Sequence, residues 1–466
     1  MYDYDVICIG AGPGGSASAM RCADRGKRVA IVEARTKNGV GGTCVNRGCI
    51  PTKALMASTN LFASLKTAKA LGIGVGESAA DFKAINRRKN AVVNNLSFGL
   101  ENFLMKPRGI DVIKARGRLL DAHTVELDDG REKRSITAEN LVIAVGSEPA
   151  YIPAFHIDGK KIVTSNELLD LTSLPKDILV VGAGAIGLEY GYLLNTFGVK
   201  VTVVEMMPNV VPVLHEPEIT DAVLKSLTRS GITVRTGVGI REISVREDGM
   251  VRASLATGEE IVTEMALVGI GRTLNTADIG LEAAGVQTGR RGMIPTDAQL
   301  RTNVPNIFAA GDITEGPQLA DKAQRQGLVI AETIAGNEFH IRYDAIPSAI
   351  FTEPEIAMIG MTASDAEAAG IRVMTGMLPF TANEKATAMQ RTEGLIKVVA
   401  REDDHRIIGA QIFGAEACDL ISEFAVAMEN DLKLEALAFT MHPHPTLTEI
   451  VMEVCKRALG LAFDRS

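Results

Sequence analysis

A glycine-rich turn that occurs twice constrains the fold of this 466-residue chain more than any other feature. Each copy follows a short apolar run, opens a stretch of helix-forming residues, and is followed by a second apolar run that ends in glutamate. In both copies the glutamate stands 23 positions after the first glycine. The turns are Gly10-x-Gly12-x-x-Gly15, with Glu33, and Gly182-x-Gly184-x-x-Gly187, with Glu205.

This strand–turn–helix–strand unit is the fingerprint of dinucleotide binding. Its glycines let the backbone approach a pyrophosphate, the helix N-terminus faces the phosphates, and the acid accepts hydrogen bonds from ribose hydroxyls. One copy alone also occurs without a ligand, but two copies 172 residues apart predict two nucleotide sites on two domains. After Glu205 come Met206, Met207 and Pro208, with no basic residue before Lys225. Because no cation meets a 2′-phosphate there, the second site is predicted to take NAD rather than NADP.

Residues 41–53, GGTCVNRGCIPTK, contain the candidate reactive group. A structural zinc site needs four ligands, and no second close pair accompanies Cys44 and Cys49. In a regular helix residues five apart are separated by roughly 7.5 Å along the axis, beyond comfortable disulfide reach. Gly48 and Pro51 allow the backbone to depart from a regular helix, and Lys53 favours thiolate. These neighbours favour a redox-active disulfide over two small buried hydrophobic side chains.

Two further patterns carry candidate functional groups. Residues 307–312 read as a strand ending in Asp312, and ligands of open α/β sheets gather at that end of a strand. Near the C-terminus, His442-Pro-His444-Pro-Thr-Leu-Thr-Glu449 places an acid five residues after His444. A histidine beside prolines is usually an ordinary loop residue. With a helix starting between the two, however, Glu449 is able to orient the imidazole and stabilise its protonated form.

The segment GGTCVNRGCIPTK resembles the active site of the FAD-dependent pyridine nucleotide–disulfide oxidoreductases, and the resemblance covers nearly the whole chain. It implies that Cys44 and Cys49 form the redox disulfide and that Cys49 lies against the flavin. It also implies that Lys53 and Glu189 form an ion pair near the flavin. His444, in a match to HxHPTxxE, is then the acid–base residue, held by Glu449 and supplied by the other subunit of a homodimer.

The same resemblance assigns FAD to the first nucleotide site and NAD to the second, with no metal. The residues expected at FAD are Gly10, Gly12, Gly15, Glu33, Gly42, Thr43, Lys53, Gly117, Gly146, Asp312 (on the ribityl chain) and Ala320. Those expected at NAD are Gly182, Gly184, Ile186, Gly187, Glu189, Glu205, Ile240 and Gly271.

The predicted fold is α/β, with two Rossmann-like dinucleotide-binding domains and a C-terminal α+β dimerisation domain. The expected boundaries are 1–150 for the FAD domain, 151–275 for the NAD domain, 276–342 for a central segment returning to the FAD domain, and 343–466 for the interface domain. Periodicity predicts helices over 53–71 and 82–104 and short strands over 110–136. In the interface domain it predicts strands near 350–360, 371–380, 394–401 and 406–414 and helices near 416–430 and 446–459.

Within the family the pattern is most similar to members that oxidise protein-bound dihydrolipoyl groups with NAD⁺. The expected partner is a lipoyl domain, either of a 2-oxoacid dehydrogenase complex or of the glycine cleavage system. Glutathione reductases should use NADPH, which the residues after Glu205 oppose. Mercuric reductases and large thioredoxin reductases carry C-terminal cysteine pairs, absent from the tail ALGLAFDRS. A catalytically idle flavoprotein subunit would need neither the cysteines nor His444. Arg47 and Asp321 depart from the common pattern, which is apolar and histidine respectively.

Composition excludes other classes. A net charge of −8 without a basic run argues against nucleic-acid binding. The N-terminus lacks a basic region and cleavage site, and no apolar run reaches membrane-spanning length, so no membrane insertion is expected. Six cysteines in a chain of this length fit a reducing compartment, and we expect a cytoplasmic protein.

Overall fold

The first domain is built on a parallel sheet that continues into an antiparallel hairpin. The computed structural model describes residues 1–34 and 39–461 of the chain. The sheet order is β3-β2-β1-β6-β5-β4, and β17 pairs with the C-terminal end of β6. Apolar runs fill β1 and β2, as expected for strands covered on both faces. The strands are β1 (Tyr4–Ile9), β2 (Val29–Glu33), β3 (Asp111–Lys114), β4 (Arg116–Leu119), β5 (Thr124–Asp128), β6 (Lys133–Ile143) and β17 (Ile307–Ala309).

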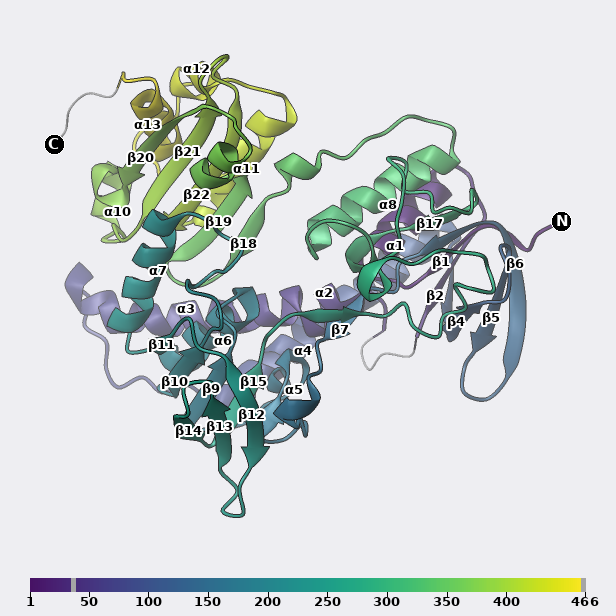
Figure 1. Ribbon diagram of the computed structural model, residues 1–466, viewed down its shortest axis with the longest axis horizontal. Helices are drawn as coiled ribbons and strands as arrows, with labels where there is room; N and C mark the ends of the chain where they lie inside the picture. Colours follow the sequence, from purple (N-terminus) through teal and green to yellow (C-terminus); the bar gives the residue numbers. More distant parts are fainter. Residues whose placement is uncertain (35–38, 462–466) are drawn as a thin grey trace.

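Strand β17 lies far along the chain from its partner, with Ile307 opposite Leu141 in a parallel register. The chain therefore returns to the first sheet after building another domain. Two helices from distant segments, α1 (Pro13–Asp24) and α8 (Ala320–Ile334), pack against each other beside this sheet (Figure 1). Glu332 of α8 forms ion pairs with Arg21 of α1 and with Arg25, the residue directly after α1, and these contacts hold the two helices together.

A helical excursion leaves this domain between β2 and β3. It contains α2 (Gly42–Arg47), α3 (Cys49–Thr67), η1 (Ala68–Leu71), α4 (Phe82–Gly99), η2 (Leu100–Met105) and η3 (Lys106–Arg108). These bounds confirm the helices predicted over 53–71 and 82–104. Helix α3 packs against α4 and against α6 (Ala185–Thr196) of the second domain. The active-site helices therefore lie at a domain junction.

The second domain repeats the strand–turn–helix plan. Its parallel sheet has the order β11-β10-β9-β15-β8, and a three-stranded antiparallel sheet, β12-β13-β14, packs beside it. The elements are β8 (Ile162–Val163), α5 (Ser165–Leu168), β9 (Asp177–Val181), α6 (Ala185–Thr196), β10 (Lys200–Val204), α7 (Pro217–Arg229), β11 (Thr233–Arg235), β12 (Ile240–Val245), β13 (Val251–Leu255), β14 (Glu260–Thr263) and β15 (Met265–Val268).

The chain enters and leaves this domain through one antiparallel ribbon, β7 (Ser147–Pro149) paired with β16 (Arg272–Leu274). Short 3₁₀ turns complete the connections of the chain: η4 (Pro153–Phe155), η5 (Arg290–Gly292), η6 (Gly311–Ile313), η7 (Tyr343–Ala345) and η8 (Phe380–Ala382). The ribbon lies between the two nucleotide domains in Figure 1.

The C-terminal domain is an antiparallel sheet in the order β18-β19-β22-β21-β20, covered by helices. The strands and helices expected from periodicity are present, except that the segment near 350–360 is divided into two antiparallel strands, β18 and β19. Helices α9, α10 and α12 are additional. The elements are β18 (Ser348–Ile350), β19 (Glu355–Gly360), α9 (Ala363–Ala368), β20 (Val373–Pro379), α10 (Glu384–Ala388), β21 (Leu395–Arg401), β22 (Ile407–Gly414), α11 (Ala417–Glu429), α12 (Leu434–Ala438) and α13 (Glu449–Ala458).

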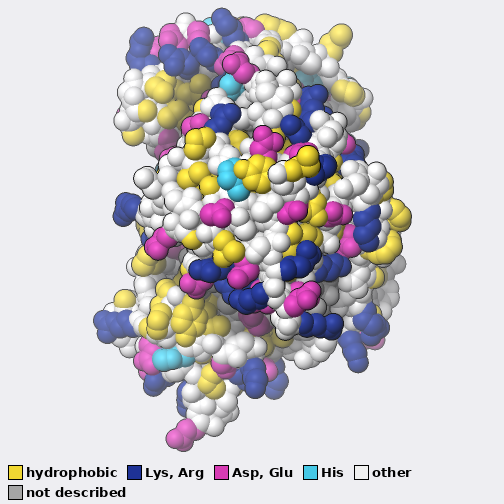
Figure 2. Space-filling model, turned by 90° about the vertical axis from the view of Figure 1, so that its right-hand side faces the viewer, with side chains coloured by type: hydrophobic (Ala, Val, Ile, Leu, Met, Phe, Trp, Pro, Cys, Tyr) yellow, Lys and Arg dark blue, Asp and Glu magenta, His cyan; other side chains and the backbone are white. Residues whose placement is uncertain are grey.

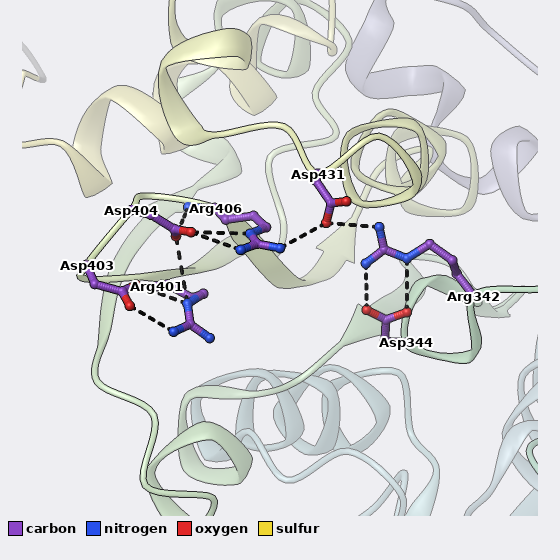
Figure 3. A network of polar contacts seen from close by, with 7 residues as sticks. All are labelled: Arg342, Asp344, Arg401, Asp403, Asp404, Arg406 and Asp431. Atoms are coloured by element: carbon purple, nitrogen blue, oxygen red, sulfur yellow. Dashed lines mark hydrogen bonds and ion pairs between the residues drawn. The ribbon is translucent and has the colours of Figure 1, made fainter.

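Alternating arginines and aspartates fasten the start of this domain to its sheet (Figure 3). Arg342, on the entering segment, contacts Asp344 and Asp431, and Asp431 also contacts Arg406 of the β21–β22 hairpin. Asp404, Arg401 and Asp403 continue the network. Single exposed ion pairs contribute little, but a network of this kind fixes geometry.

One hydrophobic core joins all three domains. It contains Leu55 and Met56 of α3, Leu188 of α6 and Phe413 of β22. A buried ion pair, Lys397 Nζ to Glu216 Oε1 at 2.7 Å, links the interface domain to the start of α7. No helix within residues 1–34 and 39–461 combines the length and apolar character needed to cross a membrane. On the face over the first domain, acidic and basic side chains are interspersed (Figure 2).

Candidate active site

The first glycine turn is shaped so that only glycine fits at two of its positions. Gly10 has a φ of +103°, and a Cβ there would overlap the carbonyl oxygen of Ala144. A Cβ on Gly15 would overlap the carbonyl oxygen of Gly10. Glu33, at the end of β2, accepts a hydrogen bond from the Ala11 N–H at 2.6 Å, and burial raises the pKa of its carboxyl group. The turn and the acid therefore form one rigid unit.

This turn opens on a cavity that fits an anionic dinucleotide. Gly42 lies against it, because a Cβ there would be 2.6 Å from the Cα of Gly12. Helices α1 and α8 both begin at the cavity, and the residues that precede them, Gly12 and Leu319, make no side-chain cap. The N-terminus of α1 can therefore meet phosphate, whereas the Asp321 carboxyl group accepts backbone hydrogen bonds in the first turn of α8. Of the residues expected at FAD, the cavity is lined by Gly10, Gly12, Glu33, Gly42, Thr43, Lys53, Gly146, Asp312 and Ala320. These residues would hold FAD.

Asp312 is fixed by two residues that the sequence did not indicate. The Ser147 hydroxyl donates a hydrogen bond to the Asp312 carboxylate. Arg272, on β16, donates to Ser147 Oγ at 2.6 Å and lies 3.8 Å from Asp312. The ribbon between the two domains therefore orients the acid at the cavity. No local signal marked this network, because Ser147 lies 125 residues before Arg272, and Arg272 lies 40 residues before Asp312.

The two cysteines stand on either side of a helix break. Cys44 lies within α2 and Cys49 is the first residue of α3, with Gly48 between the helices at φ −145° and ψ −105°. The interruption at Gly48 is confirmed, and it is what allows the two thiols to reach each other. Both face the same cavity as the glycine turn.

Hydrogen bonding divides the two thiols into different roles. The Cys44 thiol donates to Cys49, which lowers the pKa of Cys49 to about 7, and the Lys53 charge acts in the same direction. The same hydrogen bond, together with burial, raises the pKa of Cys44. In the reduced protein Cys49 therefore ionises first, and Cys44 keeps its proton.

Lys53 is held by residues of the other two domains. Its Nζ donates to both carboxylate oxygens of Glu189, at 2.8 and 3.0 Å, and lies 4.0 Å from the ring centroid of Phe351. The Phe351 N–H donates to Glu189 at 3.1 Å. Lys53 and Glu189 were predicted from the sequence, but Phe351 was not. The cation one turn after Cys49 is thus held by two residues, Glu189 and Phe351.

The second glycine turn repeats the first. Gly182 has a φ of +102°, and a Cβ there would lie 2.6 Å from the carbonyl oxygen of Gly269. Gly184 precedes α6, and no described side chain caps that helix. Glu205 accepts the Ala183 N–H at 2.7 Å through one oxygen and the Met207 N–H at 2.8 Å through the other. Each oxygen keeps a second lone pair for a ribose hydroxyl, so the turn fits NAD.

Of the remaining residues predicted to bind a cofactor, Ile186 and Glu189 line the cavity, whereas Gly117, Ile240 and Gly271 do not. Ile186 and Glu189, on α6, line the cavity that holds the cysteines and connect the second turn to it. Gly117 lies within β4, where a Cβ would press on Ile9 and Val32 at 3.1 and 3.2 Å, a packing reason for glycine. Ile240 packs against the core of the second domain. Gly271 precedes β16 with a φ of +123°. Their cofactor roles stay predictions.

His444 and Glu449 contact each other, but they lie on the surface of the C-terminal domain, away from the cysteine cavity. His444 Nδ1 lies 3.0 Å from Glu449 Oε1, and this contact raises the pKa of His444. The other oxygen of Glu449 accepts the Thr446 N–H at 2.9 Å. The His444 side chain is 64% exposed and does not line the cysteine cavity. Within one chain the imidazole is therefore not delivered to the disulfide.

Arg47 and Asp321, the two residues that depart from the common family pattern, also lie at or next to the cavity. Arg47 Nη2 is 3.3 Å from Glu148 Oε1, and both side chains line the cavity. Asp321 is in the first turn of α8, next to Ala320. Among the described residues, no group of three or more His, Cys, Asp or Glu side chains is arranged to hold a metal ion.

The thiol pair lies beside the first glycine turn, and the second glycine turn lies at the other end of the site, at the start of α6. This arrangement defines a protein that transfers electrons between thiols and dinucleotides. Comparison with known proteins agrees. The family described as pyridine nucleotide-disulphide oxidoreductase matches residues 4–327, and its dimerisation domain matches residues 346–455. The chain belongs to this family. It is an oxidoreductase that uses FAD and NAD, and its dimerisation domain supports a homodimer.

Individual relatives extend along almost the entire chain. The dihydrolipoyl dehydrogenase of Geobacillus stearothermophilus is 39% identical over 460 residues, covering 98% of this chain and 97% of its own. That of Bacillus subtilis is 37% identical over 461 residues, with the same coverage. Among solved structures, LpdA of Mycobacterium tuberculosis has a TM-score of 0.90 at 28% identity, covering 97% of this chain and 99% of its own. The flavoprotein disulfide reductase RclA of Escherichia coli has a TM-score of 0.86 at 26% identity, with the same coverage.

Proposed function

We propose that this protein is a dihydrolipoyl dehydrogenase, which oxidises protein-bound dihydrolipoamide to lipoamide and reduces NAD⁺ to NADH. The observation that carries the proposal is the thiol pair on the wall of the dinucleotide cavity, with Lys53 beside it and separate roles for Cys44 and Cys49. The full-length similarity to dihydrolipoyl dehydrogenases supports the choice of substrate.

The first chemical step needs a base for the substrate thiol, because thiolate is the nucleophile in disulfide exchange. His444 Nε2 takes this proton, while Glu449 holds Nδ1 and stabilises the imidazolium. The substrate thiolate attacks the Cys44 sulfur and forms a mixed disulfide. The Cys44–Cys49 bond breaks, and Cys49 leaves as a thiolate stabilised by Lys53.

The second substrate thiol completes the exchange. It attacks the substrate sulfur bonded to Cys44, closes the cyclic lipoyl disulfide, and releases Cys44. The proton of this second thiol passes to the Cys44 sulfur, and the first proton stays on His444. Two electrons now reside on the cysteine pair. The chemistry that bound FAD would supply is the transfer of this electron pair to NAD⁺. The protein contributes Glu189, which keeps Lys53 fixed next to Cys49, and Glu205, which shapes the turn at the second site.

The proposal includes the partners and the location. The exposure of His444 supports delivery of its imidazole to the cysteine pair of the partner subunit, and Phe439 and Met441 beside it are 66% and 94% exposed, as an interface requires. The substrate arm belongs to a lipoyl domain of a 2-oxoacid dehydrogenase complex or of the glycine cleavage system. The thiol chemistry fits a reducing compartment, the cytoplasm.

The test measures NADH formation from dihydrolipoamide by the purified FAD-loaded protein, with NAD⁺ and NADP⁺ compared. We expect turnover with NAD⁺, loss of turnover in Cys49→Ser, and a loss of at least about 100-fold in His444→Ala. Cys418→Ser is the matched control, because Cys418 is a half-buried cysteine outside the cavity, and it should keep activity. Full FAD occupancy without turnover in the wild type would refute the proposed substrate.

A further inference from the structure

A second imidazole, His442, lies two residues before His444 and has the opposite environment. Its Nε2 is 2.8 Å from Glu423 Oε1 of α11, and its Nδ1 is 2.9 Å from the carbonyl oxygen of Thr440. The His442 side chain is only 6% exposed, against 64% for His444. The sequence singled out His442 as part of the motif, but the proposed reaction gives it no role.

The contacts of His442 determine its charge. A carbonyl oxygen only accepts hydrogen bonds, so Nδ1 must carry a hydrogen to contact Thr440. A carboxylate also only accepts, so Nε2 must carry a hydrogen to contact Glu423. An imidazole with both hydrogens is the imidazolium cation. His442 and Glu423 thus form a largely buried cation–anion pair whose net charge is zero.

The pair fixes one end of the loop that carries His444. At the other end, the Asn383 side chain, itself 5% exposed, donates to the Thr446 carbonyl at 3.1 Å, and the Thr446 N–H is held by Glu449. The loop between α12 and α13 is therefore anchored on both sides of His444. The His444 ring remains exposed between two fixed points.

We propose that the His442–Glu423 pair is a positioning device for His444, which anchors its loop and keeps the electrostatic surroundings of the reacting imidazole neutral. This inference rests on the proposed function of His444 as the acid–base group. It assigns His442 a role as a positioning residue, since the ring contacts Glu423 and Thr440 rather than substrate or cofactor.

The charged and titratable groups around this loop are few. Glu449 of α13 contacts His444. Burial opposes ionisation of the Glu449 carboxyl group, but the Thr446 N–H, then His444 and finally His442 lower its pKa below the usual value. Glu384 of α10 lies 3.5 Å from His444 Nε2. Cys455 of α13 lies near enough to Glu423 for the carboxylate to raise the pKa of its thiol, in addition to burial. Glu423 is therefore the anion whose charge is left uncompensated when His442 is changed.

The experiment compares His442→Gln, Glu423→Gln and the double variant in the FAD-loaded dimer. Glutamine at 442 keeps a donor for Glu423 but removes the cation. The remaining Glu423 charge makes His444 hold its proton more tightly. The acid limb of the kcat/KM profile for dihydrolipoamide should then move up by about 0.5 pH unit, the size of a unit charge acting across a solvated surface. Glu423→Gln should cause no upward shift, and the double variant should return to the wild-type profile.

A purely structural role predicts a different pattern, in which all three variants lose activity without moving the profile. That result would overturn the proposal, as would a double variant shifted as far as His442→Gln. Thermal melting and FAD content establish that each variant is folded. Titration of the His444 ring by NMR of histidine-labelled protein gives the same shift without turnover. Failure of the wild type to oxidise dihydrolipoamide counts against the proposed function, whereas an unshifted His444 titration in His442→Gln counts against the positioning role.

Discussion

Two alanine substitutions in the second glycine turn separate coenzyme binding from packing. A Cβ at Gly187 would overlap the Gly182 carbonyl oxygen and would lie 3.0 Å from its carbon and 3.2 Å from Val180. Ordinary carbon–carbon contact lies near 4 Å, so α6 has to withdraw by roughly 1 Å. Overpacking of this kind costs about 3 kcal/mol. We therefore expect Gly187→Ala to destabilise the NAD domain and to weaken NAD⁺ binding as a consequence.

Gly184→Ala should weaken NAD⁺ binding more than it lowers the stability of the domain. No heavy atom of the described residues lies within 4 Å of a Cβ placed on Gly184, and its φ of −82° suits alanine. The loss of stability should stay below about 1 kcal/mol, the cost of alanine at an N-cap. The added methyl group does, however, enter the space through which a pyrophosphate reaches the start of α6. A loss of about 1–3 kcal/mol in binding corresponds to a roughly 5- to 150-fold rise in KM for NAD⁺.

The assay combines thermal unfolding with the KM for NAD⁺ and the Kd for NADH in FAD-loaded protein. Gly74→Ala is the matched control, since nothing among the described residues lies within 4 Å of its Cβ and it belongs to neither turn. An unchanged KM in Gly184→Ala would refute the second turn as the NAD site. A Gly187→Ala protein as stable as the wild type would refute the packing argument.

Other predictions concern charge. Glu205→Ser removes the carboxylate that repels a 2′-phosphate and should raise the ratio of NADP⁺ to NAD⁺ turnover at least about tenfold, measured as kcat/KM for each coenzyme. Lys53→Met removes a cation that favours the Cys49 thiolate. The thiolate absorbance of the reduced protein, which appears as pH rises through about 7, should then appear at higher pH. An unchanged titration would contradict the role of Lys53. Hydrogen bonds from Arg25 lower the pKa of Glu332 to about 2. This carboxylate therefore stabilises the fold above the unfolded pKa near 4.5, and the stabilisation is lost as pH falls from 4.5 towards 2. In Glu332→Gln the free energy of unfolding should depend less on pH in this range, as measured by acid unfolding followed by circular dichroism.

Local sequence patterns were sufficient for the parts of the site that lie close together in the chain. Both glycine turns, their acids and the interruption at Gly48 follow from residue types whose backbone behaviour is known in advance. Lys53 and Glu189 came from the resemblance, and their ion pair is present at 2.8 Å. These features depend on short segments, so neighbouring residues carry the information.

The supporting contacts were not predictable in the same way. Phe351 reaches Glu189 and Lys53 from the interface domain, and Arg272 reaches Asp312 from the ribbon between the nucleotide domains. An ordinary phenylalanine and arginine become parts of the site only because the domains pack as they do. For His444, the spacing of the motif predicts the contact with Glu449, whereas its position outside the cysteine cavity of its own chain was expected only from the resemblance, which has His444 supplied by the other subunit.

The pairing of β17 with β6 also has a consequence for how the protein is made. The second domain runs without interruption from β8 to β15, so a ribosome completes it as one piece. The first sheet, begun earlier, lacks its last parallel strand until Ile307–Ala309 has been synthesised, after roughly ten to thirty seconds more of translation past Ile143. Asp312 and the start of α8 follow directly. The domain that is begun first is therefore finished after the second, and FAD finds its complete site only on a nascent chain that already carries a whole NAD domain.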